Sequence, residues 1–526
     1  MQAKPTPRAA FAALVLGVAL SGGAGTGQAA LPSTQVAWLP AAAPAAVERA
    51  FTQARAQGKP LLLYWGATWC PPCNQLKATL FNRQDFAALS QSFVAVHVDG
   101  DRPGAQKLGQ QFKVSGYPTL VLFRPDGGEL MRLPGEADAA QVMELLQQGL
   151  AGGRPVRELL ADARAGRALM PAEWRVLAFY SWETDDEQLL AGSSAAGVLA
   201  ELAPAASGAD AQTAARLWLR ALAASDEGKG LKADDALRQR VRQVLGDAAQ
   251  VRALADVIVN RAPEMVRALG DTPAAREPWR TAFEPVLVRL QADAGLARAD
   301  RLGALLARVE LARLEEPRTE LRPALPPSLR DELRAQAQAA DREITDAYER
   351  QAVIPTAAYV LERAGLWEDA QALLQANLAR SISPYYLMSQ LGGLNRRLGH
   401  TQQALEWYAK AYAQSQGPAT RLQWGAGYLK ALIELAPAQG ARIEATARQL
   451  LTEAAQDRGA FYKRSARSLQ RAGVALQGWN ADGSHDARLR RLRAQLEPLC
   501  RRVDAADGQQ ARCRTLLGEQ GKRAAG

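Results

Sequence analysis

Two cysteines three positions apart, Cys70 and Cys73, place the strongest constraint on how this chain folds. They lie in the run Trp69-Cys70-Pro71-Pro72-Cys73, after the apolar stretch Leu61–Trp65 and before residues 74–80, which have a helical composition. A strand followed by a helix puts the pair at a helix N-terminus, where free N–H groups stabilise a thiolate. We therefore expect thiol–disulfide exchange, with Cys70 as the more exposed, attacking thiol and Cys73 as the resolving thiol.

The same cysteine spacing also occurs in zinc sites, which usually need four ligands. The other two cysteines, Cys500 and Cys513, lie near the far end of the chain, and none of the three histidines has ligand spacing with the pair. We therefore expect no metal and no other cofactor at Cys70 and Cys73. For Cys500 and Cys513 we expect a structural disulfide across the turn at residues 504–508, and a second redox pair is the alternative.

The residues around Cys70 alternate between helical and strand patterns. Such an alternation predicts a layered α/β domain. The predicted segments are helix 44–57, strand 61–65, helix 74–80, strand 93–99, helix 103–112, strand 120–123, a hairpin turn at 125–128 with strand 129–133, and helix 137–150.

This part of the chain, predicted as a domain over residues 44–151, resembles the thioredoxin superfamily. The resemblance rests on Trp69–Cys73, on Gly116-Tyr117-Pro118-Thr119 and on the order of these motifs around three strands. It implies that Pro118 is cis and faces the cysteines. It also implies that Trp69, Tyr117 and Pro118 form the substrate groove, with Tyr117 offering backbone groups to an extended substrate.

The local sequence is most similar to the periplasmic, reductase-type members of this superfamily, including the soluble end domain of the membrane electron transporter. The resemblance therefore implies a protein-disulfide reductase or isomerase. One departure concerns proton transfer, because a buried Asp of the family is replaced here by Tyr64. The acid–base partner of Cys73 therefore remains unassigned by the sequence.

The N-terminus has the pattern of an export signal, predicted over residues 1–29. Basic residues precede an uncharged apolar run at residues 9–20, and Gly27-Gln28-Ala29 has the small residues of a cleavage site. We expect cleavage after Ala29, with Ala30 as the rival, then an extended segment over 30–43, and a soluble periplasmic protein. The formal net charge is +10, but the basic residues are interspersed with acidic ones, which argues against nucleic-acid binding.

Beyond residues 152–155, which read as a flexible linker, the strand patterns disappear. Helix-forming residues dominate two regions, 156–316 and 328–526, separated by a proline-rich break. In the second region Gly365 and Gly399 are 34 residues apart, which is the tetratricopeptide period. We expect a solenoid of tetratricopeptide-like repeats there, and an irregular α-solenoid is the alternative.

Together these features predict a thioredoxin-like α/β domain followed by a long helical-repeat region. The expected function is a periplasmic thiol–disulfide oxidoreductase that exchanges disulfides with client proteins and with a redox-partner protein of the inner membrane. The repeats would select the partner, and residues 30–150 would fold with a core of their own. The alternative is a helical-repeat binding protein whose thioredoxin-like module is a docking element without catalysis.

Overall fold

The computed structural model describes residues 35–135, 137–185, 188–190, 192–225, 230–317 and 319–518. The predicted signal peptide, its cleavage site and the first residues of the extended segment lie outside these ranges, so they stay predictions. Within the described ranges, no helix combines the length and the apolar character needed to cross a bilayer.

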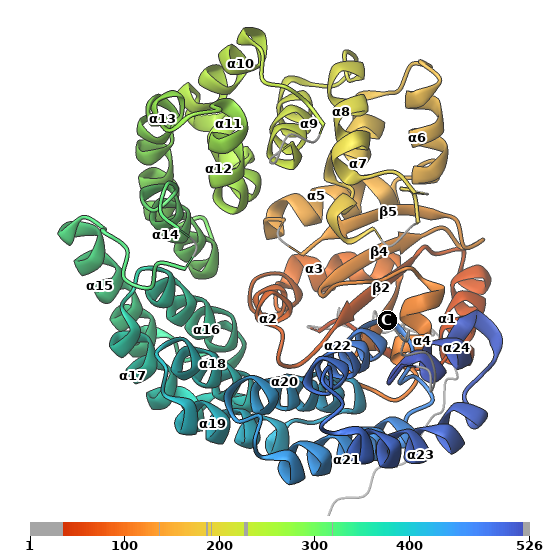
Figure 1. Cartoon of the computed structure of the whole chain (residues 1–526). Helices are drawn as coiled ribbons and strands as arrows, with labels where there is room; N and C mark the ends of the chain where they lie inside the picture. The colour runs from red at the N-terminus through yellow and green to blue at the C-terminus, as the bar shows by residue number, and fades with distance from the viewer. Residues whose placement is uncertain are drawn as a thin grey trace, which may run out of the picture. The chain divides into compact units, whose positions relative to one another are not determined.

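A five-stranded sheet forms the centre of the N-terminal part (Figure 1). The strand order is β1-β3-β2-β4-β5, in which β1 and β2 run parallel to β3 while β4 runs antiparallel to β2 and β5. The central strand β2 is buried along its whole length, which explains its continuous apolar sequence. The strands are β1 Leu39–Ala41, β2 Leu61–Gly66, β3 Val94–Asp99, β4 Thr119–Phe123 and β5 Glu129–Pro134.

The helices of this part cover the sheet at the predicted places, and one further helix and one further strand are present. The short helix α3 and the edge strand β1 were not predicted, because neither segment is long enough to show a periodic pattern. The first helix ends at Gly58, whose left-handed φ of 63° lets its N–H donate back to the last turn. The helices are α1 Pro44–Gln57, α2 Pro71–Leu76 with a π-helical turn Lys77–Phe81, α3 Gln84–Leu89, α4 Ala105–Gln111 and α5 Ala139–Leu150.

From residue 156 onward the described chain is built of helices, so the predicted fold class, an α/β domain followed by a long all-helical region, is confirmed. The helices are α6 Val156–Arg164, α7 Pro171–Phe179, α8 Ala195–Ala205, α9 Ala211–Ala224, α10 Asp235–Gly246, α11 Ala248–Ala253, α12 Ala255–Leu269, α13 Pro273–Ala292, α14 Arg298–Ala312, α15 Pro327–Glu343, α16 Ala347–Arg363, α17 Trp367–Asn377, α18 Pro384–Arg397, α19 Thr401–Gln414, α20 Pro418–Leu435, α21 Gly440–Gln456, α22 Lys463–Trp479, α23 Asp486–Arg502 and α24 Gln509–Thr515.

The predicted repeat positions fall at equivalent places in two helix pairs. Gly365 and Gly399 occupy the turns α16–α17 and α18–α19 with left-handed φ values of 72° and 78°. Ala370 and Ala404, five residues further on in each pair, are fully buried where consecutive helices meet. These positions follow the predicted period, and the assignment to the tetratricopeptide class stays a prediction.

The hydrophobic core continues across the predicted linker. Leu120 and Leu130 of the sheet belong to the same buried cluster as Leu160, Leu177 and Trp182 of the helical part. The helices α6 and α7 pack on the edge strand β5. The expectation that residues 30–150 have a core of their own is therefore wrong for this face of the sheet, because the following helices complete it.

Helices far along the chain return to the segment that carries the cysteines. The helix α16 packs against α2, and α22 packs against α4 (Figure 1). The redox motif therefore lies where the α/β part meets helices that follow it by about three hundred residues.

Candidate functional site

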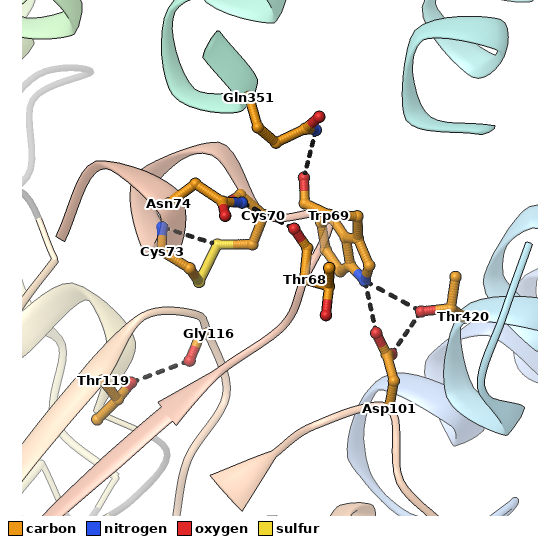
Figure 2. Close-up of a disulfide and its surroundings, with 10 residues drawn as sticks. All are labelled: Thr68, Trp69, Cys70, Cys73, Asn74, Asp101, Gly116, Thr119, Gln351 and Thr420. Atoms are coloured by element: carbon orange, nitrogen blue, oxygen red, sulfur yellow. Dashed lines mark hydrogen bonds between the residues drawn. A yellow bond between two sulfur atoms is a disulfide. The ribbon is translucent and has the colours of Figure 1, made fainter. Parts of the chain in front are cut away.

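Cys70 and Cys73 form a disulfide across the first turn of α2, with their Cα atoms 5.3 Å apart (Figure 2). Cys70 is the N-cap residue, and its Sγ accepts a hydrogen bond from the N–H of Cys73 at 3.2 Å. Pro71 suits the first helical position because its ring fixes the required φ and its missing N–H is not needed there. A backbone N–H directed at Sγ would stabilise the Cys70 thiolate in the reduced protein.

The Tyr117–Pro118 peptide bond is cis, as the resemblance implies. Thr119 fixes this turn by donating its hydroxyl to the carbonyl of Gly116 at 2.9 Å. Gly135 passes so close that a Cβ at that position would lie 2.3 Å from Pro118 Cγ. Tyr117, together with Trp69, packs against the small cluster that contains both cysteines.

The side chains of Cys70 and Cys73 are both buried in this oxidised state. Cys70 is 2% exposed and Cys73 is 0% exposed, whereas the flanking Thr68 and Pro72 are exposed. Both thiols are covered in this conformation, although Cys70 was expected to be the more exposed of the two. The cover arises because helices α16, α20 and α22 contact the loop around Cys70.

Trp69 is the residue on which these contacts centre (Figure 2). Its indole N–H donates to Asp101 Oδ2 at 2.9 Å and to Thr420 Oγ1 of α20 at 3.0 Å. Its carbonyl accepts from Gln351 Nε2 of α16 at 3.1 Å. Its ring stacks on Tyr386 of α18 at a centroid distance of 5.9 Å.

A buried ion pair joins Asp101 to Arg464 of α22. Burial raises the pKa of Asp101, and the charge of Arg464 opposes this shift. The Arg464 guanidinium also lies over the rings of Trp69 and Tyr117, at 5.0 and 5.3 Å from their centroids. One cation therefore contacts both aromatic residues that were predicted to line the substrate groove.

Gln106 of α4 extends this network to the second predicted loop. Its side-chain amide donates to the Tyr117 hydroxyl at 2.8 Å and to the Gly100 carbonyl at 2.7 Å. Its side-chain oxygen accepts the backbone N–H of Arg464 at 3.0 Å.

Asp101, Thr420 and Arg464 were not among the site residues predicted from the sequence. Asp101 follows a predicted strand and could have been noticed as a polar residue at its end. Nothing local marks Thr420 or Arg464, because their partners are more than three hundred residues away in the chain.

Tyr64, at the position of the family's buried acid, does not replace that acid. Burial, and then the charge of Asp99, raise the pKa of Tyr64, so its hydroxyl stays protonated. Its ring stacks on His97 at 4.9 Å, and its buried hydroxyl has no hydrogen-bond partner among the described residues. Burial, and then nearby cations, lower the pKa of His97 to about 4, so this side chain is neutral near pH 7.

Asn74 is the polar side chain that lies directly beside the disulfide (Figure 2). Its amide nitrogen donates to the carbonyls of Thr68 and Cys70 at 2.7 and 2.8 Å. Its Oδ1 is buried and has no hydrogen-bond partner among the described residues. The amide therefore holds the loop in shape without carrying a charge that could exchange protons with Cys73.

The remaining predicted pair lies at the other end of the chain. Cys500 and Cys513 form a second disulfide, with Cα atoms 5.4 Å apart, and both side chains are buried. This bridge ties α23 to α24. In the part of the chain that the structure describes, no group of three or more His, Cys, Asp or Glu side chains could hold a metal ion.

The comparison with known families covers the part of the chain that carries Cys70, Cys73 and Pro118. The thioredoxin-like domain family matches residues 47–150. The thiol:disulfide interchange protein DsbD 1 of Pseudomonas aeruginosa is 31% identical over 121 residues, which cover 22% of this chain and 20% of that protein. The chain thus spans about a fifth of the length of the interchange proteins it matches.

A shorter relative is matched over most of its length. A thioredoxin-like protein of Synechocystis is 36% identical over 89 residues, which cover 17% of this chain and 80% of that protein. A solution structure of a thioredoxin from Thermus thermophilus aligns at 28% identity over 19% of this chain and 81% of that chain, with a TM-score of 0.18. With its Cys70–Cys73 disulfide, its cis Pro118 and its matched residues 47–150, the chain belongs to the thioredoxin-like family.

Proposed function

We propose that this protein is a thiol–disulfide oxidoreductase that exchanges disulfides with client proteins through Cys70 and Cys73. The single observation that supports this most directly is the disulfide across the start of α2, capped by the Cys73 N–H and adjacent to Tyr117. The matched relatives named as thiol:disulfide interchange proteins support the same reaction class.

In the reducing direction the reaction has two steps. The Cys70 thiolate attacks one sulfur of the substrate disulfide, a mixed disulfide forms, and the other substrate sulfur leaves as a thiolate. The Cys73 thiolate then attacks Cys70 Sγ and releases the second substrate sulfur as a thiolate. Two electrons pass from the cysteine pair to the substrate, and a dithiol partner protein, proposed to lie in the inner membrane, restores the reduced pair.

The position of each cysteine supports these proposed roles. Cys70 is the N-cap residue and its sulfur receives the Cys73 N–H, an arrangement that suits an attacking thiolate. Cys73 is fully buried inside the first turn, which suits a resolving thiol that meets only Cys70. Tyr117 and Pro118 are proposed to position an extended substrate segment, and the helical repeats are proposed to select the partner.

The proposed location is the periplasm, after cleavage of residues 1–29. The support is the export-signal pattern of the sequence together with two disulfides, which persist in oxidising compartments. N-terminal sequencing of protein released by osmotic shock tests it. A full-length product that pellets with membranes would contradict this location.

The burial of Cys70 favours a second candidate, a helical-repeat binding protein whose cysteine pair stays oxidised. The discriminating assay uses reduced, desalted protein and a small aromatic disulfide, with thionitrobenzoate release as the readout. Exchange in the wild type, its loss in Cys70→Ser and its retention in the matched double variant Cys500→Ser/Cys513→Ser would support the oxidoreductase. Equal release by wild type and Cys70→Ser would favour the binding protein.

A further inference from the structure

We propose that the helical region closes the redox site and that the Asp101–Arg464 ion pair stabilises this closed state. Protein disulfides then reach Cys70 only when α20 and α22 move away. This inference rests on the proposed function and names the regulation of the same site. It gives a role to Asp101, Thr420 and Arg464, three residues that no sequence motif links to the cysteine pair.

The closing contacts fall on both segments that a substrate must reach. Thr420 and Arg464 contact Trp69, the residue before Cys70. One turn further along α22, Arg467 donates to the carbonyl of Ser115 at 3.1 Å, three residues before cis Pro118. A protein chain cannot lie along either segment while these contacts are in place.

Apart from the packing of the Trp69 ring on Tyr386 and Trp424, these contacts are hydrogen bonds and an ion pair, so this interface is the one that can open. On the face of the sheet covered by α2, α3 and α5, the hydrophobic core is continuous with α6–α9, and opening it would expose that core to water. In contrast, Trp69 is the single described side chain of the α/β part that joins the hydrophobic clusters of α18–α24. Water can replace hydrogen bonds and an ion pair at far lower cost than it can replace buried apolar contacts.

A cavity that could hold water lies beside the Asp101–Arg464 ion pair. A cavity of about 580 Å³ is bounded by Thr68 and Asp101 on the sheet side and by Tyr385 and Gly417 on the helical side. Gly417 permits this approach, because a Cβ there would lie 2.7 Å from Asp101 Cβ. When α20 moves, water in this cavity can solvate the Asp101 carboxylate and the Arg464 guanidinium.

Among the contacts that hold the site closed, the ion pair is the strongest. Asp101 accepts hydrogen bonds from Trp69, Thr420 and Arg464, so one buried carboxylate holds the loop and two helices. Hydrogen bonds to a charged group are stronger than those between neutral groups. Removing Arg464 leaves Asp101 buried without its cation, and the carboxylate then favours the open, hydrated arrangement.

The test compares two maleimides of equal chemistry and unequal size, N-ethylmaleimide and a 5-kDa polyethylene glycol maleimide, on the reduced full-length protein. Labelling of Cys70 is followed by peptide mass, and the ratio of the large-reagent rate to the small-reagent rate is the readout. The variants are Arg464→Gln and the milder Thr420→Val. The matched control is Arg471→Gln on the same helix, whose guanidinium donates to Ser468 Oγ instead.

We expect the rate ratio to rise about tenfold in Arg464→Gln, which corresponds to about 1.4 kcal/mol in the opening equilibrium. We expect about threefold in Thr420→Val and no change in Arg471→Gln. An unchanged ratio in a folded Arg464→Gln protein would overturn the proposal. If that variant does not fold, an unchanged ratio in Thr420→Val overturns it.

This readout is independent of disulfide turnover. If the wild-type protein shows no exchange with the small disulfide, the proposed function is rejected. The labelling ratios would then still test whether the helical region closes the site. Intact small-disulfide exchange with unchanged ratios would reject the closure alone.

Discussion

Replacing Arg132 with methionine is expected to destabilise the protein by about 4 kcal/mol, because it isolates a buried carboxylate. Arg132 lies on β5 and is 1% exposed, and its Nε and Nη2 donate to the two oxygens of Glu129 at 3.0 and 2.9 Å. Glu129 is 9% exposed. Gln188 donates to the same carboxylate at 3.4 Å, but a neutral amide cannot balance its charge.

The magnitude follows from what the substitution leaves behind. Breaking one partner of a buried ion pair costs about 3–5 kcal/mol. The guanidinium also donates to the carbonyls of Phe112 and Lys113 at 3.0 and 3.2 Å, and a buried carbonyl without a donor costs about 1 kcal/mol or more. These two costs overlap, since the chain relaxes around both. The double variant Arg132→Met/Glu129→Leu removes both charges but still leaves the two carbonyls without this donor, so we expect it to lose about 2 kcal/mol.

Urea unfolding of the oxidised protein measures these effects, with tryptophan fluorescence and far-UV circular dichroism as parallel signals. The four proteins of the double-mutant cycle give the coupling between Arg132 and Glu129, expected to be at least about 2 kcal/mol. A loss below about 1 kcal/mol in Arg132→Met would refute the reasoning. So would a double variant that is no more stable than Arg132→Met.

The other predictions concern the cysteines and the buried histidine. Cys73→Ser is expected to trap mixed disulfides with clients whereas Cys70→Ser is not, and non-reducing gels followed by mass spectrometry check this; equal trapping would reverse the two roles. Replacing Cys500 and Cys513 with serine is expected to lower the stability by about 3 kcal/mol, because the cross-link restricts the unfolded chain; an unchanged melting temperature would contradict this. Burial first, and then two nearby cations, lower the pKa of His97 from 6.5 to about 4. The unfolded chain therefore binds more protons between these values, and stability should fall by at most about 3 kcal/mol as the pH drops from 6.5 to 4. His97→Phe should flatten this dependence in thermal melts recorded against pH, and equal slopes in both proteins would count against it.

Much of the α/β part could be predicted from the sequence because its signals are local. The predicted strands 61–65 and 120–123 are apolar runs, and α1 shows a helical period that stops at Gly58. The position of Cys70 at a helix start follows from the strand before it and from Pro71 after it. The edge strand β1 was missed because its three residues gain their conformation from pairing with β3, which lies far along the chain.

Local sequence patterns were enough to predict a thioredoxin-like domain with a cysteine pair at a helix start, followed by a long helical region. The cover over Cys70 could be seen only in the folded chain, because Thr420 and Arg464 approach Trp69 from more than three hundred residues away. The same holds for the core, which continues past residue 151 into α6 and α7. The physical reason is that backbone preferences and hydrophobic periods are set by neighbouring residues, whereas burial and ion pairing depend on which distant segments the fold brings together.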